Sequence, residues 1–104
     1  MRTLEEIRAL VIEGVTRYNN AATPAKRIVR VELFGSYAAG YATKESDIDL
    51  LVEFAAPNVG LFALAAVLET MEVATGMSVD IVQSPLPADS LLEIERSVPL
   101  YAAA

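Results

Sequence analysis

The sequence predicts an α/β (α+β) protein with a small mixed β-sheet flanked by helices, in the order α-β-α-β-α-β-α. Two observations predict this class. Stretches with apolar residues at helical spacing alternate along the chain with short runs rich in β-branched residues. In addition, 54% of the 104 residues are apolar, which at this length is enough for one core but not for two. We therefore expect a single domain over residues 1–104.

The N-terminal segment has the pattern of a capped amphipathic helix. Thr3 and Glu6 have the spacing of a capping box. Apolar residues then recur at helical spacing: Leu4, Ile7, Val11, Val15 and Tyr18. A helix over about residues 4–18 is expected, followed by a connector and a first strand over residues 28–34. Strict alternation assigns Val29, Val31 and Leu33 to one face of this strand, and Ile28, Arg30, Glu32 and Phe34 to the other.

The remaining elements follow from similar patterns. A short helix over residues 37–40 ends at Gly40, and a polar loop leads to a second strand over residues 47–54. A core-facing helical stripe then ends at Gly76, and its members are Leu61, Leu64, Ala65, Leu68 and Met71. A third strand is expected over residues 78–83 and a last short helix over residues 90–96. Residues 99–101 are expected to be a tail that packs back or meets a partner.

The composition excludes several classes of function. The chain has no cysteine, which excludes disulfides and zinc–thiolate sites, and no histidine, which excludes Ser-His and Cys-His catalysis and the common zinc enzyme sites. The formal charge of −6 and the absence of a basic cluster argue against a surface that coats nucleic acid. No signal peptide or membrane span is evident, so a cytoplasmic protein is expected.

Three aspartates are the candidate metal ligands. Asp47 and Asp49 are spaced i, i+2, so on a strand both project from one face, while Ile48, Leu50 and Val52 project from the other face into a core. Two carboxylates roughly 7 Å apart repel each other unless a cation lies between them, and Mg²⁺ binds through one or two carboxylates plus substrate phosphates. Asp80 lies alone in an apolar run, where a charge is costly unless it is paired or binds metal.

Gly35 and Ser36, directly after the first strand, are the candidate phosphate site. A glycine lets the backbone approach a ligand closely, and the start of a short helix offers free N–H groups. Taken alone, Gly-Ser is more often a plain turn, and an Asp-x-Asp pair is more often a solvated strand edge. Together with Asp80, however, they could converge at one end of a small sheet as a two-metal phosphoryl-transfer site.

These motifs resemble a known family. Gly35-Ser36, ten residues and then Asp47-Ile48-Asp49 match the signature of the polymerase β-like nucleotidyltransferase superfamily. The small size, "LFGSYA", "SDIDLLVEF" and "VDIV" resemble its minimal nucleotidyltransferases, the MntA-like antitoxins, over about residues 28–101. The resemblance implies the minimal nucleotidyltransferase fold. It also implies that Asp47 and Asp49 are the metal-binding pair, that Asp80 is the third carboxylate and general base, and that Gly35 and Ser36 hold the phosphates.

The resemblance further implies a function and a partner. Such proteins transfer AMP from ATP, with two Mg²⁺ ions, to a tyrosine hydroxyl of a HEPN-domain toxin encoded beside them, which silences this ribonuclease. One departure is that Ala39 stands where the family often has arginine; Lys44 could compensate, although a solvated lysine is the simpler interpretation. Two alternatives therefore stay open: an inactive antitoxin that neutralises its partner by stoichiometric binding, and, less favoured in so short a chain, a small-molecule nucleotidyltransferase.

Overall fold

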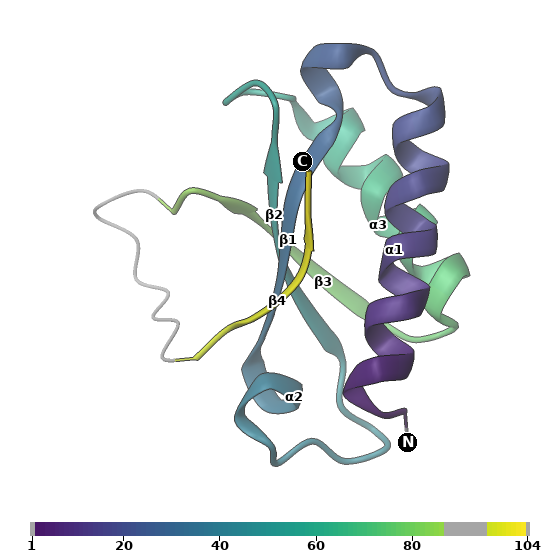
Figure 1. The fold of residues 1–104 in the computed structure, drawn as a ribbon, viewed down its shortest axis with the longest axis vertical. Helices are drawn as coiled ribbons and strands as arrows, with labels where there is room; N and C mark the ends of the chain where they lie inside the picture. The colour runs from purple at the N-terminus through teal and green to yellow at the C-terminus, as the bar shows by residue number, and fades with distance from the viewer. Residues whose placement is uncertain (1, 87–95, 104) are drawn as a thin grey trace.

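The computed structural model describes residues 2–86 and 96–103, and these form one mixed sheet with helices against it (Figure 1). The elements in chain order are α1 (Leu4–Ala21), the 3₁₀ turn η1 (Pro24–Lys26), β1 (Ile28–Phe34), α2 (Gly35–Ala39), β2 (Ile48–Phe54), α3 (Leu61–Thr75), β3 (Val79–Ser84) and β4 (Val98–Ala102). The strand order is β3-β2-β1-β4. β1 is antiparallel to β2 and β4, whereas β2 is parallel to β3. The predicted fold class is confirmed.

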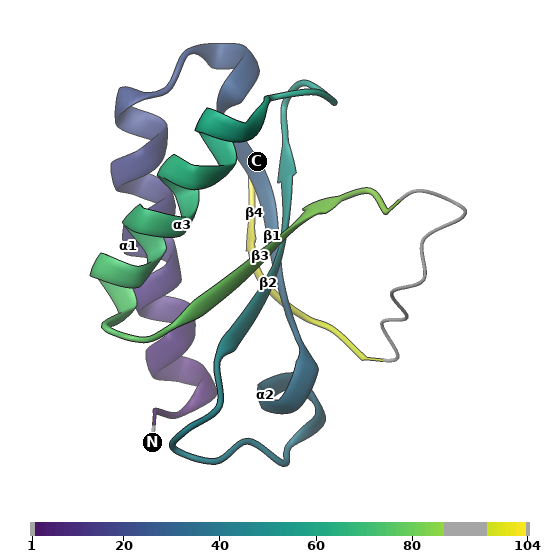
Figure 2. The ribbon, with the colours of Figure 1, turned by 180° about the vertical axis from the view of Figure 1, so that it is seen from behind.

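Helices α1 and α3 lie side by side on one face of the sheet, and α2 lies at one end of it, where β1 ends (Figures 1 and 2). The two long helices approach closely at Gly14 of α1. A Cβ atom at Gly14 would lie 2.7 Å from the sulfur of Met71 and 3.3 Å from the Cβ of Ala74, both on α3. The missing side chain therefore provides the room in which Met71 packs.

The predicted capping box at the start of α1 is confirmed. The Thr3 hydroxyl accepts a hydrogen bond from the backbone N–H of Glu6 (3.1 Å), and the Glu6 carboxylate accepts one from the N–H of Thr3 (3.0 Å). The helix continues to Ala21, beyond the predicted end near residue 18. Asn19 lies inside the helix. Its side-chain oxygen accepts a hydrogen bond from the N–H of Ile28 (2.8 Å), and its side-chain nitrogen donates one to the carbonyl of Ile28 (3.0 Å). Asn19 thereby fixes the start of β1 against α1.

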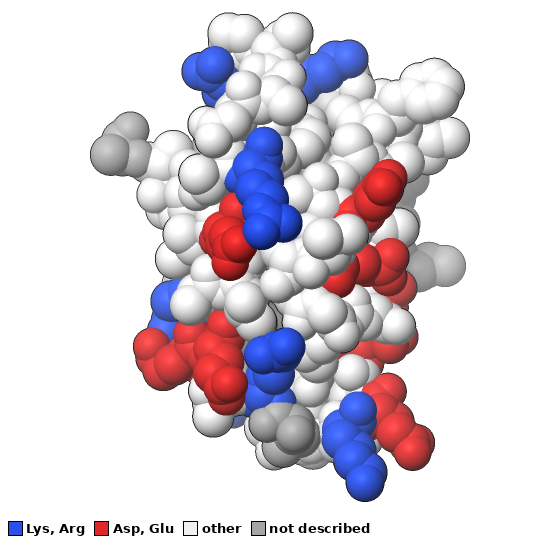
Figure 3. All heavy atoms as spheres, turned by 90° about the vertical axis from the view of Figure 1, so that its right-hand side faces the viewer, with Lys and Arg blue, Asp and Glu red and all other residues white. Residues whose placement is uncertain are grey.

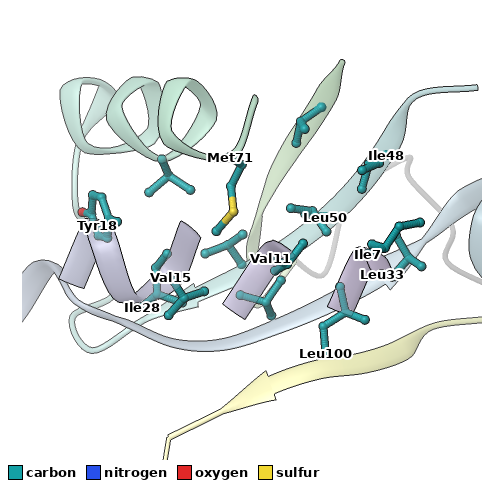
Figure 4. Close-up of a cluster of buried hydrophobic side chains, with 14 of the residues drawn as sticks. Ile7, Val11, Val15, Tyr18, Ile28, Leu33, Ile48, Leu50, Met71 and Leu100 are labelled. Atoms are coloured by element: carbon teal, nitrogen blue, oxygen red, sulfur yellow. The ribbon is translucent and has the colours of Figure 1, made fainter. Parts of the chain in front are cut away.

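The core lies between the two long helices and the sheet (Figure 4). The predicted α1 stripe is buried at Ile7, Val11, Val15 and Tyr18, whereas its first member, Leu4, is exposed. The predicted stripe of α3 is partly wrong. Met71 is buried, and Leu64 and Leu68 are partly buried against the core. The other buried apolar positions of this helix are Ala63 and Val67, while Leu61 and Ala65 are exposed. Because α3 is apolar on most of its circumference, spacing alone could not select the buried face.

Strict alternation along β1 is also wrong at its first residues. The pairing of Ile28 with Phe54 and of Arg30 with Glu53 leaves Val29 as an extra residue, which is a β-bulge. The bulge turns Ile28 into the core beside Val31 and Leu33, and Ile28 is 1% exposed. Alternation is correct only from Arg30 onward.

The C-terminal residues form a strand and not a tail. β4 pairs with β1 through Val31 and Tyr101, Glu32 and Pro99, and Leu33 and Val98. Leu100 is buried in the core. The predicted last helix, residues 90–96, falls almost entirely outside the described residues. The glycine stops predicted at Gly40 and Gly76 are confirmed, because both end their helices in the left-handed conformation.

Candidate active site

Asp49 is at the centre of the candidate site. It stands beside Phe34, the last residue of β1, on one side and beside Asp80 of β3 on the other. Its strand neighbours Ile48 and Leu50 are fully buried in the core, as predicted, so the Asp49 side chain projects from the face opposite the long helices. The parallel pairing of β2 and β3 thus brings two of the three predicted carboxylates next to each other.

Gly35 contacts Asp49 directly. Its φ of +74° lies in the left-handed region, which favours glycine. A Cβ atom at this position would overlap Oδ2 of Asp49 and lie 2.9 Å from its Cγ. Any side chain here would displace the carboxylate. The sequence motif predicts phosphate binding at Gly35; the structure adds that Gly35 makes room for Asp49.

No side chain caps the N-terminus of α2. Its N-cap residue, Phe34, makes no capping hydrogen bond, so the first N–H groups of the helix keep their capacity to donate to a ligand. The carbonyl of Ser36 accepts hydrogen bonds from the N–H groups of Gly40 (3.0 Å) and Tyr41 (3.1 Å), which fixes the turn. Ser36 is itself partly exposed. Gly35 and Ser36 therefore border Asp49 with donors suited to a phosphate.

The carboxylates impose an electrostatic cost on one another. The pKa of Asp49 is raised to about 6, first by its burial, then by the negative charge of Asp80 and a hydrogen bond shared with it, and then by the charge of Asp47. Within the described residues, the three ion pairs involve other acids: Glu5, Glu13 and Glu32. A cation bound here would relieve this repulsion, and carboxylate oxygens are the ligands that Mg²⁺ prefers. The donor set fits the metal.

Asp47 is less firmly placed than the other two aspartates. It comes directly before β2, which begins at Ile48 and not at Asp47 as predicted. No hydrogen-bonded ladder therefore fixes it. Both Asp47 and Asp80 are exposed, so the expected cost of burying the Asp80 charge does not arise, but Asp80 lies within β3. Among the residues that the structure describes, no three acidic side chains lie close enough together to form a ready-made metal cluster. Asp49 and Asp80 form the fixed part of the site, and the role of Asp47 as a ligand stays a prediction.

The missing positive charge noted in the sequence is also missing in the folded helix. The last turn of α2 has no basic residue, and Ala39 is exposed there. Lys44 is exposed on the loop between α2 and β2. Any compensating cation on this side of the site must come from that loop or from a partner.

Comparison with known proteins identifies the family. The model of the nucleotidyltransferase domain matches residues 19–99. A relative from Methanocaldococcus jannaschii, named as a putative protein adenylyltransferase, is 35% identical over 83 residues, which is 79% of each chain. The chain belongs to the nucleotidyltransferase domain family, as the sequence motifs predicted.

Solved structures share the fold. One is a toxin–antitoxin crystallised with AMP-PNP; the match covers 88% of this chain and 73% of that one, with a TM-score of 0.65 and 22% identity. Another is a tri-AMPylated HEPN toxin of Shewanella oneidensis in complex with an MNT antitoxin; the match covers 92% of this chain and 73% of that one, with a TM-score of 0.59 and 19% identity. Within the described part of the chain, no helix has the length and hydropathy needed to cross a membrane.

Proposed function

We propose that this protein is a Mg²⁺-dependent adenylyltransferase that transfers AMP from ATP to a tyrosine hydroxyl of a HEPN-domain toxin, as the antitoxin of a toxin–antitoxin pair. The observation that carries the proposal is the contact of Gly35 with Asp49, beside the paired Asp80. Family membership supports the chemistry, and the names of the relative and of the similar structures support the choice of AMP and of a HEPN partner.

Each residue has a defined task in this reaction. The backbone N–H groups at Gly35 and Ser36 hold the phosphates of ATP, and the Ser36 hydroxyl adds a donor. The tyrosine oxygen attacks the α-phosphorus, the bond to pyrophosphate breaks, and Asp80 accepts the hydroxyl proton. Asp47 and Asp49 would hold Mg²⁺, which would neutralise charge on the phosphates.

The rival function is neutralisation by stoichiometric binding. The specific observation that favours it is the absence of a basic residue in the last turn of α2, where Ala39 leaves the triphosphate without a fixed positive charge. A binder of this kind would need neither ATP nor Mg²⁺ and would leave the mass of the toxin unchanged. The two functions therefore separate in one assay.

That assay is the intact mass of the HEPN-domain partner after incubation with this protein, ATP and Mg²⁺. The proposal predicts a gain of one or more AMP groups that requires both additions. A stable complex whose toxin keeps its original mass would establish the binder instead. Binding of Mg²⁺ and AMP-PNP to this protein alone, measured by calorimetry, tests the nucleotide site without the partner.

A further inference from the structure

The outer face of α1 and α3 carries an apolar groove that the proposed reaction does not use. Its volume is about 580 Å³. Its lining is mainly apolar and includes Tyr18, Ala21, Ala22, Phe62, Ala66 and Val73. Phe62 is 91% exposed and Val73 is 68% exposed. Large apolar side chains so exposed beside one groove mark an interaction surface.

The exposed apolar residues of α3 form one stripe. Phe62, Ala66 and Val73 are spaced i, i+4 and i+11, which places them within about 40° of one another around the helix. The buried residues Ala63, Val67 and Met71 lie on a different side, against the core. Glu69 is i+7 from Phe62 and therefore lies in the same stripe. α3 thus has a second, mainly apolar face, which the described residues leave exposed at Phe62 and Val73.

The charges on the two walls of the groove are opposite. Arg17 lines the α1 wall and Glu69 lines the α3 wall, and Lys26 of η1 adds a second basic side chain to the lining. Figure 3, which views the side of the molecule where the long helices lie, shows a central basic side chain with acidic atoms directly beside it and further acidic side chains across uncharged surface. Arg17 also pairs with Glu13 (2.6 Å), but both side chains are about half exposed, so that pair is weak and does not prevent a second contact.

We propose that this face binds a second copy of the chain in a two-fold dimer. A two-fold axis along the groove sets the α1 wall of each copy against the α3 wall of the other. Arg17 of each copy then faces Glu69 of the second copy, and Phe62 enters the wide end of the opposite groove over the small side chains Ala21 and Ala22. This is the self-complementarity that an isologous interface requires.

The dimer would leave both candidate active sites open. The groove lies on the outer side of the helical layer, whereas Asp49 projects from the opposite face of the sheet. Two adjacent helices of 18 and 15 residues offer roughly 500 Å² of projected area per copy, or about 1,000 Å² in total, which is below the roughly 1,200 Å² of a stable interface and in the range of weak, transient ones. We therefore expect a reversible dimer whose population depends on concentration in the micromolar range.

Sedimentation velocity over a concentration series tests the dimer with a matched pair of variants. Phe62→Asp should shift the protein to monomer, with a rise of at least tenfold in the dissociation constant. Leu61→Asp is the control, because Leu61 is also exposed (80%) and adjacent on α3 but is not among the residues that line the groove. It should leave the dimer unchanged. Circular dichroism checks that both variants stay folded.

Charge reversal provides a second test of the dimer. Arg17→Glu and Glu69→Arg should each weaken the dimer, and an equimolar mixture of the two single variants should restore it, because opposite charges then face each other only between two different copies. A wild-type chain that stays monomeric at every concentration would overturn the proposal. So would a dimer that Phe62→Asp leaves intact, or a monomer in which Phe62→Asp abolishes binding of the HEPN partner. AMP transfer is tested separately, by the mass of the partner after incubation with the wild-type protein.

Discussion

At the scale of single residues, Gly35 links the backbone to the chemistry. A side chain at Gly35 would be disfavoured for two reasons, the left-handed backbone conformation and the collision with Asp49. A second glycine, which shares only the first of these features, serves as a control. Gly40 also has a positive φ (+87°), but a Cβ there would meet no atom within 4 Å. The backbone strain is common to both positions, and the collision with the carboxylate belongs to Gly35 alone.

Substitution of these two glycines should therefore give different results. Gly35→Ala and Gly40→Ala should each destabilise the fold by about 1 kcal/mol through strain. Only Gly35→Ala should also abolish Mg²⁺-dependent binding of AMP-PNP, because Asp49 is displaced. Calorimetric titration and chemical denaturation of both variants measure the two effects. Equal nucleotide binding by the two variants would remove Gly35 from the site.

The raised pKa of Asp49 predicts how stability varies with pH. The folded pKa of about 6 lies above the ordinary value of 3.8, so the folded state is favoured while Asp49 is protonated and loses this advantage as the pH rises through 6. Asp49→Asn removes the charge. The variant should be more stable than the wild type by about 1 kcal/mol at pH 8, after allowance for solvent screening, and the difference should shrink toward pH 5.

Urea denaturation in EDTA at pH 5 to 8 measures this difference. Added Mg²⁺ should then stabilise the wild type at pH 8, where Asp49 is ionised, and not the Asn variant. Parallel stability profiles for the two proteins would show that Asp49 titrates normally and that the carboxylates do not repel one another as described.

At the scale of elements, the sequence predicted the parts that local pattern determines. The capping box at Thr3, the strand over residues 28–34 and the glycine stops follow from local chemistry, and all are found in the structure. The elements that were missed depend on distant contacts. The bulge at Val29 is visible only in the register with β2, and β4 is a strand only because β1 offers it an edge.

Leu100 tests the importance of β4. Leu100 is buried in the core, whereas Pro99 in the same strand is exposed. Leu100→Ala should destabilise the protein by about 2–4 kcal/mol, since it opens a cavity in the core. Pro99→Ala should change the free energy of unfolding by less than about 1 kcal/mol. Chemical denaturation of both variants is the measurement. Equal effects would mean that the C-terminal residues do not pack as a strand.

At the scale of the whole molecule, the order of the strands assembles the site. Asp49 and Asp80 are far apart in the sequence, and only the parallel pairing of β2 with β3 makes them neighbours. Sequence motifs could name these residues because the family pattern includes them. They could not reveal the contact between Gly35 and Asp49, which depends on a backbone angle, or the looser placement of Asp47, which depends on where β2 begins.

The central claim is that these carboxylates carry out AMP transfer to a HEPN-domain partner, and the intact mass of that partner tests it most directly. The matched variants are Asp49→Asn and Glu53→Gln, because Glu53 lies at an alternate position of the same strand, near its other end. With ATP and Mg²⁺, the wild type and Glu53→Gln should add AMP to the partner, and Asp49→Asn should not. A partner whose mass stays unchanged with the wild-type protein, or rises equally with Asp49→Asn, would contradict the account.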